Sequence, residues 1–177
     1  MPESSLILNA AAIQRALIRI AHEIAERNEN SEEVVLVGIQ TGGVPLAERL
    51  ITALKGIWGH EVPMGKLDVS MHRDDLDRRM APDVHPTIIP FDVTGKTVVV
   101  VDDVLFKGRT VRAAMDALND FGRPKRIQLA VLIDRGHREL PVKADFVGKN
   151  LPTAQTESVL VLLDEPGTPD QVTLEKP

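Results

Sequence analysis

Cysteine is absent from this chain of 177 residues, which excludes disulfide bonds, thiolate metal ligands and cysteine nucleophiles. Aromatic residues make up only 3% of the chain, too few to favour a platform on which single-stranded bases stack. No apolar run approaches the roughly 20 residues that span a bilayer. Residues 1–9 also lack a basic stretch followed by an apolar one, so we expect a cytoplasmic protein that uses no membrane.

The length and the 43% hydrophobic content predict one domain, residues 1–177, around one sizeable core. A net charge of −5 argues against general nucleic-acid binding. Between Arg109 and Lys149, however, nine lysines and arginines stand against five acidic residues. This local excess permits a basic face on an acidic protein, although chance clustering explains it equally well.

Apolar runs alternate with helical spacings along the chain. Asn9 is placed to cap a helix whose buried stripe comprises Ile13, Leu17, Ile20, Ala21 and Ile24. Strands are predicted at 34–39, 62–71, 98–101, 127–133 and 159–163, and further helices at about 45–57 and 109–121, with a loose tail at 166–169. The alternation predicts an α/β fold, a mainly parallel sheet with helices on both faces.

The segment from Val98 to Thr110 is the most informative one, because a buried valine strand ends there in two carboxylates and continues into a glycine turn and a helix. Asp102 and Asp103 suit vicinal sugar hydroxyls, and the backbone N–H groups of residues 106–110 suit a phosphate on the same sugar. The simpler interpretation is an ordinary strand-to-helix connection with solvated aspartates.

Two other strands are followed by polar junctions. Residues 40–43 read Gln-Thr-Gly-Gly, and residues 134–138 read Asp-Arg-Gly-His-Arg. The carboxyl ends of parallel strands meet at one edge of a sheet, so the three junctions are expected to converge there. The charged residues 72–79 predict a solvated loop.

Residues 98–110 resemble the phosphoribosyl pyrophosphate (PRPP) motif of type I phosphoribosyltransferases. Further stretches, at 15–23, 36–39, 73–76, 108–113 and 129–150, resemble the PyrR family, regulators of pyrimidine operons that also act as uracil phosphoribosyltransferases. The resemblance implies a type I phosphoribosyltransferase fold with a small hood, conversion of uracil and PRPP to UMP and pyrophosphate, and Mg²⁺ bound with PRPP. It also implies UMP-dependent binding of pyr leader mRNA and a homo-oligomer, a dimer or a tetramer.

The resemblance also assigns residues. Asp102, Asp103 and Arg73 correspond to catalytic positions, with no metal ligand assigned to the protein itself. Substrate-binding positions are Thr41, Gly42, Gly43, Lys107, Gly108, Arg109, Thr110, Phe146 and Val147. RNA-binding positions are Arg19, His22, Arg27, His137, Arg138, Lys143 and Lys149. From the residues alone, Phe146 also suits core packing, and each cation also suits an ordinary solvated surface.

Three departures from the family fall within the substrate site. Gly42 stands where the family has arginine, Lys107 where it has threonine or serine, and His72 where it has tyrosine. Loss of a charge-assisted contact to pyrophosphate costs about 1.5–3 kcal/mol. We therefore expect reduced transferase activity; the alternative is a nucleotide-sensing, RNA-binding attenuator with little or no catalysis. A third, weaker hypothesis is that the protein transfers phosphoribose to a base other than uracil.

Overall fold

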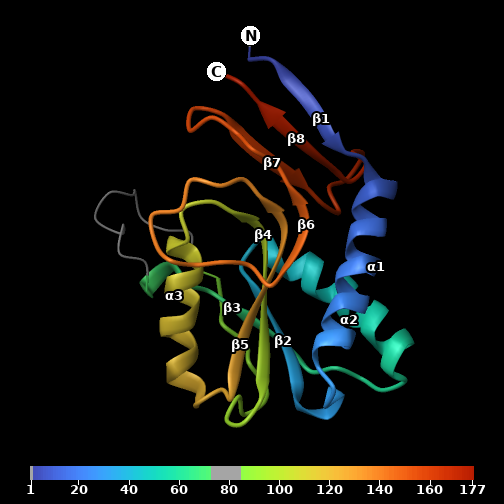
Figure 1. Ribbon diagram of the computed structural model, residues 1–177, viewed down its shortest axis with the longest axis vertical. Coiled ribbons are helices and arrows are strands. Elements are labelled where there is room, and N and C mark those ends of the chain that lie inside the picture. Colours follow the sequence, from blue (N-terminus) through green and yellow to red (C-terminus); the bar gives the residue numbers. More distant parts are fainter. Residues whose placement is uncertain (1, 73–84) are drawn as a thin grey trace.

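A five-stranded parallel sheet forms the centre of the computed structural model, which describes residues 2–72 and 85–177. Its strands lie in the order β3-β2-β4-β5-β6. Their bounds are β2 Val34–Ile39, β3 Met64–Leu67, β4 Thr97–Leu105, β5 Arg126–Asp134 and β6 Phe146–Asn150. The expected parallel sheet is therefore confirmed, and its carboxyl edge points toward the upper part of Figure 1.

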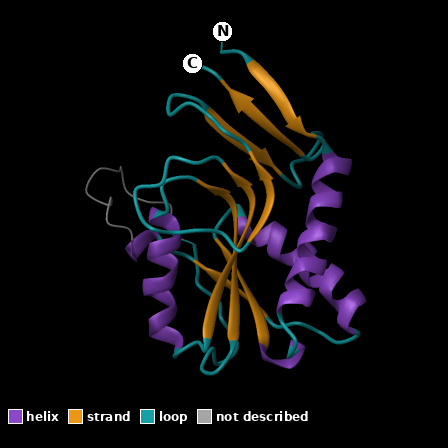
Figure 2. Cartoon of the chain, viewed as in Figure 1, coloured by secondary structure: helices purple, strands orange, loops and turns teal. Residues whose placement is uncertain are grey.

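Helices cover both faces of this sheet. Helices α1 (Ala10–Arg27) and α2 (Gly43–Trp58) pack on one face, and α3 (Arg109–Leu118) packs on the other (Figure 2). Because side chains alternate along a strand, Val99 and Val101 of β4 join the core beneath α1 and α2. Val98 and Val100 join the core beneath α3. The valine run is therefore buried on both faces, as its uniform composition predicts.

Helix α1 begins as the sequence predicts. The Asn9 side chain accepts a hydrogen bond from the Ala12 backbone N–H at 2.8 Å. The five stripe residues are buried, whereas Arg15, Arg19 and His22 are exposed on the other side of the helix. Helix α1 also contacts β6, the edge strand, so its exposed cations lie at the margin of the sheet.

A second, antiparallel sheet lies beyond the carboxyl ends of the parallel strands (Figure 1) and forms the hood. Its order is β1-β8-β7, with β1 at Ser4–Leu8, β7 at Ser158–Leu162 and β8 at Gln171–Glu175. The sequence predicted only β7. Strands β1 and β8 are five residues each and partly exposed, so neither shows a strong apolar pattern.

The strand predicted at 62–71 is shorter than expected. It divides into β3 and a 3₁₀ turn, Ser70–His72, and further 3₁₀ turns occur at Ser31–Glu33 and Asn119–Phe121. The loop predicted at 72–79 lies outside the described residues except for His72, whose ring nitrogen is 3.3 Å from Asp120 Oδ2. Among the described residues, no helix has the length and apolarity to cross a membrane.

Arg49 joins the hood to α2. Its guanidinium contacts Asp164 Oδ1 and Asp170 Oδ2, each at 2.8 Å, in the connection between β7 and β8. The hydrogen bond from Arg49 lowers the pKa of the Asp170 carboxyl. The hood is therefore held by an ion pair in addition to its apolar contacts with the core beneath α1 and α2.

A buried amide pair joins the end of α1 to β5 and supports a stability prediction. Asn28 donates to Gln128 Oε1 at 2.9 Å, and Gln128 donates back to Asn28 Oδ1 at 3.2 Å. Asn28→Ala leaves the Gln128 amide unsatisfied, so we expect unfolding in urea to show a loss of about 1–3 kcal/mol. Asn30→Ala, at an exposed position, is the control. Equal stability of the two variants would contradict the assignment.

Candidate functional site

A cavity of about 320 Å³ opens where β2 and β4 end. The sequence predicted five of the residues that line it, namely Thr41, Gly42, Asp102, Asp103 and Thr110. It did not single out Gln40 or the pair Val69 and Ser70, which follow β3. Only its position could have indicated Ser70 as a site residue, because β3, which it follows, also ends at this edge of the sheet.

The two aspartates are held by the backbone of their own strand. Asp102 Oδ1 accepts a hydrogen bond from the Asp103 N–H at 2.9 Å, and Asp103 Oδ1 accepts from the Val104 N–H at 2.8 Å. Asp102 is 8% exposed, and Asp103 is half-buried. These bonds fix acceptor groups at the cavity wall, an arrangement that suits a ligand with neighbouring hydroxyls.

The glycine loop lies directly on the end of β4. The peptide bond between Gln40 and Thr41 is cis. A Cβ on Gly43 would overlap the Val101 carbonyl oxygen, and a Cβ on Gly42 would overlap the Asp103 carboxylate, with Cγ only 2.5 Å away. The absence of both side chains lets the loop approach the carboxylates this closely. Gly42 therefore affects the position of Asp103 as well as the local backbone.

Residues 105–108 connect β4 to α3, and we call them the phosphate turn after the ligand that the sequence predicts there. Gly108 caps the helix with φ +94°, a conformation that suits glycine. Thr110 lies in the first turn of α3, where backbone N–H groups favour an anion. Lys107 is exposed, with its Nζ 3.9 Å from Glu139 Oε2, and Arg109 Nε is 3.2 Å from Glu139 Oε1. The unusual lysine thus points toward a carboxylate on the neighbouring segment.

The other predicted substrate or catalytic residues do not line this cavity: Gly43, Lys107, Gly108 and Arg109 belong to the glycine loop or lie where β4 leads into α3, and Phe146, Val147 and Arg73 lie elsewhere or outside the described residues. Phe146 is 2% exposed and belongs to the core beneath α1, so the structure favours the core-packing interpretation. Val147 packs with the core beneath α3, and its carbonyl accepts from Arg19 at 3.2 Å. Neither lines the cavity. Arg73 lies outside the described residues.

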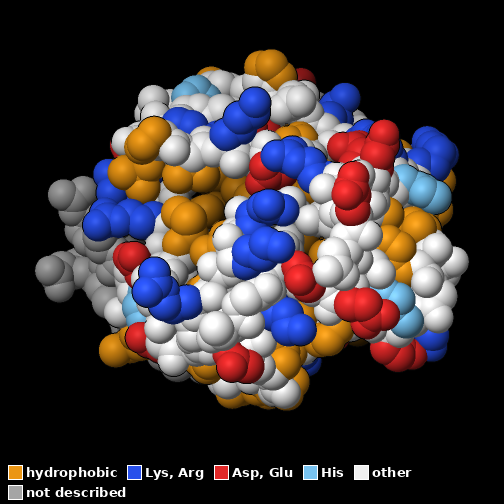
Figure 3. Space-filling view, turned by 60° about the horizontal axis from the view of Figure 1, so that its bottom comes forward, with side chains coloured by type: hydrophobic (Ala, Val, Ile, Leu, Met, Phe, Trp, Pro, Cys, Tyr) orange, Lys and Arg blue, Asp and Glu red, His pale blue; other side chains and the backbone are white. Residues whose placement is uncertain are grey.

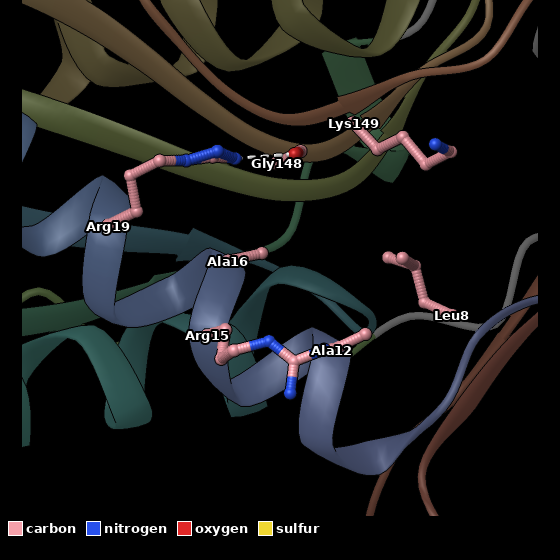
Figure 4. A pocket seen from close by; sticks show the side chains of 7 residues that line it. All are labelled: Leu8, Ala12, Arg15, Ala16, Arg19, Gly148 and Lys149. Carbon is pink, nitrogen blue, oxygen red and sulfur yellow. Dashed lines mark hydrogen bonds between the residues drawn. The ribbon is translucent and has the colours of Figure 1, made fainter.

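A second cavity, of about 300 Å³, lies between α1 and β6. Figure 4 shows Arg15 and Arg19 on the helix and Lys149 on the facing strand. Arg19 donates to the Gly148 carbonyl at 2.5 Å, which holds the helix against the strand. Arg15 was not among the predicted RNA-binding residues, although its spacing of four from Arg19 places both on one helical face.

The cations continue along α1 from this cavity. Arg27 lies 3.4 Å from Asp145, just before β6, and Asp145 lines a further cavity with Lys143 and residues of α3. We call Arg15, Arg19, Arg27, Lys143 and Lys149 the basic track; His22 is exposed on the same helix. Figure 3 shows Lys and Arg side chains gathered across the middle of one face, with acidic side chains beside them.

Two predicted RNA-binding residues lie elsewhere. Arg138 donates to the Phe106 carbonyl at 2.8 Å and the Val142 carbonyl at 3.0 Å, and it pairs with Asp134 Oδ2 at 2.6 Å. His137 Nε2 lies 2.6 Å from the Thr153 carbonyl oxygen. Both residues pack beside the phosphate turn instead of along α1, and charge in the sequence gave no indication of this difference.

The phosphoribosyl transferase domain family matches residues 5–165. A relative from Chloroflexus aurantiacus named "Bifunctional protein PyrR" is 59% identical over 175 residues, covering 98% of this chain and 96% of its own. Another of that name, from Thermus thermophilus, is 56% identical over 169 residues, covering 95% and 93%. A solved hypoxanthine phosphoribosyltransferase from Trypanosoma cruzi, in complex with IMP, has a TM-score of 0.72 at 21% identity, covering 99% and 91%.

Fold and cavity together define a phosphoribosyltransferase domain, with acidic residues at the end of a central strand and a glycine turn before a helix. The sequence comparisons narrow this class. The chain belongs to the PyrR family.

Proposed function

We propose that this protein regulates pyrimidine biosynthesis and transfers phosphoribose to uracil, giving UMP and pyrophosphate from uracil and PRPP. The observation that carries the proposal is the cavity where the glycine loop, Asp102, Asp103 and the start of α3 converge. The relatives named "Bifunctional protein PyrR" support both activities. We also propose a cytoplasmic location and a homo-oligomer, a dimer or a tetramer.

The reaction breaks the bond between the ribose C1 and the diphosphate oxygen and forms a bond from C1 to a uracil ring nitrogen, while positive charge develops on the sugar. Pyrophosphate leaves, and the ring nitrogen loses its proton to solvent. Asp102 and Asp103 orient the ribose by accepting from its hydroxyls. The N-terminus of α3 holds the 5′-phosphate, with Arg109 and Thr110 in its first turn. Residues 41–43 provide the backbone surface for the diphosphate. The protein contributes chiefly by positioning these groups and by excluding water.

The residues fit a Mg²⁺ ion that arrives with PRPP. Magnesium favours oxygen ligands and commonly uses one or two carboxylates together with substrate phosphates. Asp102 and Asp103 supply such carboxylates at the cavity wall. Among the described residues, no group of three or more acidic or histidine side chains forms a complete metal cage. Bound there, Mg²⁺ would neutralise charge on the departing diphosphate.

A direct test is UMP formation from uracil and PRPP with magnesium present. We expect turnover below that of the Thermus thermophilus relative, because Gly42 and Lys107 replace contacts to the diphosphate and the phosphate. Calorimetric titration with UMP should show binding in either case. Turnover equal to that of the relative would contradict the reduced activity, and the absence of both turnover and UMP binding would contradict the proposed function.

A regulator with little catalysis is the second candidate, and two contacts favour it. Lys107 pairs with Glu139, and the Asp103 carboxylate fills the space beside Gly42. Both arrangements affect diphosphate or phosphate handling while leaving carboxylates for a ribose. UMP binding with no measurable turnover is the result expected of this candidate.

For the regulatory activity, we propose that UMP-loaded protein binds pyr leader mRNA through the basic track. UMP must then bind the RNA-binding conformation more tightly than the alternative conformation. Equal affinity for both would leave RNA binding independent of UMP. The track suits a phosphate backbone because Arg15, Arg19 and Arg27 follow one another along α1, with Lys149 on the facing strand β6. Lys143 lies just before β6, beside Asp145, the partner of Arg27. His137 and Arg138 enter this proposal as residues that support the nucleotide site instead of contacting RNA.

Loss of track cations is expected to weaken RNA binding and its salt dependence. The double variant Arg15→Gln, Lys149→Gln removes two charges at one cavity. Each phosphate contact contributes about 0.7–0.9 to the slope of log affinity against log salt, so the slope should fall by roughly 1.4–1.8. Gel shifts with UMP at several salt concentrations measure it. Lys96→Gln, Arg123→Gln is a control of equal charge, and an equal effect there would contradict the assignment.

A further inference from the structure

Three successive carbonyls of the phosphate turn accept hydrogen bonds from one segment, residues 135–139. The Arg135 backbone N–H donates to the Leu105 carbonyl at 3.0 Å. The Arg138 guanidinium donates to the Phe106 carbonyl at 2.8 Å. The Glu139 backbone N–H donates to the Lys107 carbonyl at 3.0 Å. The segment therefore determines the path of the turn that we propose holds the 5′-phosphate.

The Arg135 side chain joins the same segment to residues 153–157. Its Nε donates to Thr153 Oγ1 at 3.1 Å, and a terminal nitrogen donates to the carbonyls of Ala154 at 3.0 Å and Glu157 at 2.8 Å. The guanidinium carbon lies 4.0 Å from the centre of the Phe106 ring. Residues 153–157 lie between β6 and β7, so they connect the sheet that carries Lys149 to the hood.

Burial of the Arg135 side chain costs free energy, because its guanidinium is charged. It is 6% exposed, and burial lowers the pKa of its guanidinium. A buried cation costs free energy unless its donors are satisfied, and apolar side chains fill such positions at lower cost. The cation–π contact and the three hydrogen bonds offset this cost at the meeting point of two segments. Packing alone does not require a charge there.

The Phe106 ring forms the other half of the link. The His137 ring meets it edge-on, with centroids 5.6 Å apart, while His137 Nε2 contacts the Thr153 carbonyl. Phe106 thus contacts two side chains that both bond to residues 153–157. A shift of the turn that moves this ring therefore changes contacts on which the 153–157 segment depends.

We propose, resting on the proposed function, that Arg135 is a positioning residue that couples occupancy of the phosphate turn by a nucleoside 5′-monophosphate to the placement of residues 153–157. The ligand phosphate stabilises one position of the turn, and with it one position of the Phe106 ring against Arg135. The connection from β6 to the hood then favours the matching conformation. UMP, which carries the phosphate, exerts this effect; uridine, which lacks it, does not.

Hydrogen exchange on the full-length protein tests the coupling, with saturating UMP compared with saturating uridine. In the wild type, UMP should slow exchange in residues 153–157 about tenfold relative to uridine, within the range usual for coupled sites. Arg135→Met should abolish this difference. Arg135→Lys keeps the charge but loses the planar set of donors, so it should restore only part of it.

Phe106→Leu is the second variant, because it removes the ring while leaving the hydrogen bonds of Arg135 in place. It too should reduce the difference between UMP and uridine. Equal exchange with UMP and uridine in the wild type, or full protection in both Arg135→Met and Phe106→Leu, would overturn the inference. Failure of UMP to bind the wild type would overturn the proposed function as well, so calorimetry on the same samples distinguishes the two failures.

Discussion

Replacing Asp102 and Asp103 together with asparagine is expected to weaken UMP binding by roughly a hundredfold, because two charged acceptors of ribose hydroxyls are lost at once. Both carboxylates are held at the cavity wall by backbone N–H groups. Isothermal titration measures the loss. The amide retains one acceptor oxygen at each position, so the fold is expected to persist.

The nature of the ligand provides the sharpest control for this variant. The 2′,3′-dideoxy analogue of UMP lacks the hydroxyls, so the double variant and the wild type should bind it alike. Asp116→Asn, on the exposed side of α3, should leave UMP affinity unchanged. An equal loss of affinity for UMP and for the dideoxy analogue would show that the carboxylates act otherwise than on the ribose.

The second large effect is expected at Gly42, where an added side chain displaces Asp103. Gly42→Ala should weaken the binding of UMP and of PRPP about tenfold each, since its Cβ overlaps the Asp103 carboxylate. Gly42→Arg should weaken UMP binding by the same factor. Its guanidinium should nonetheless bind PRPP about 10- to 100-fold more tightly than the alanine variant does, because only PRPP carries a diphosphate. Titration with both ligands measures this divergence.

The same reasoning predicts a change in the rate of UMP formation. Gly42→Arg combined with Lys107→Thr should form UMP faster than the wild type, since a diphosphate contact and a phosphate-binding hydroxyl are both introduced. Gly56→Ala is the matched control, because a Cβ there meets nothing within 4 Å. Unchanged UMP affinity in Gly42→Ala would mean that Asp103 adjusts without cost.

The elements that could be predicted from sequence are those whose apolar residues follow a regular pattern. The α1 stripe and the four valines of β4 signal their elements because burial on one face, or on both, imposes a regular pattern. The candidate site followed from the rule that ligands bind at the carboxyl edge of parallel strands. Strands β1 and β8 lacked such a signal, because each is only five residues long and partly exposed.

Side-chain partners could not be predicted in the same way. Arg138 and Arg19 look alike as cations in a sequence, yet Arg138 donates to a carbonyl of the phosphate turn and Arg19 donates to carbonyls of β6. Phe106 gave no indication of its contact with a buried guanidinium. Such contacts depend on which loops meet in space, and the local pattern of residues carries no information about that.

The pairing of Ser4 with Glu175 has a consequence for biosynthesis. Strand β1 is made before the other strands described, but its hydrogen-bonding partner β8 becomes available only after residues 171–175 have been made. The parallel sheet, whose strands lie between residues 34 and 150, has no such delay. Domains begin to fold during synthesis, and distant contacts form slowly. The parallel sheet with the candidate cavity is therefore expected to form before the sheet of the hood is complete.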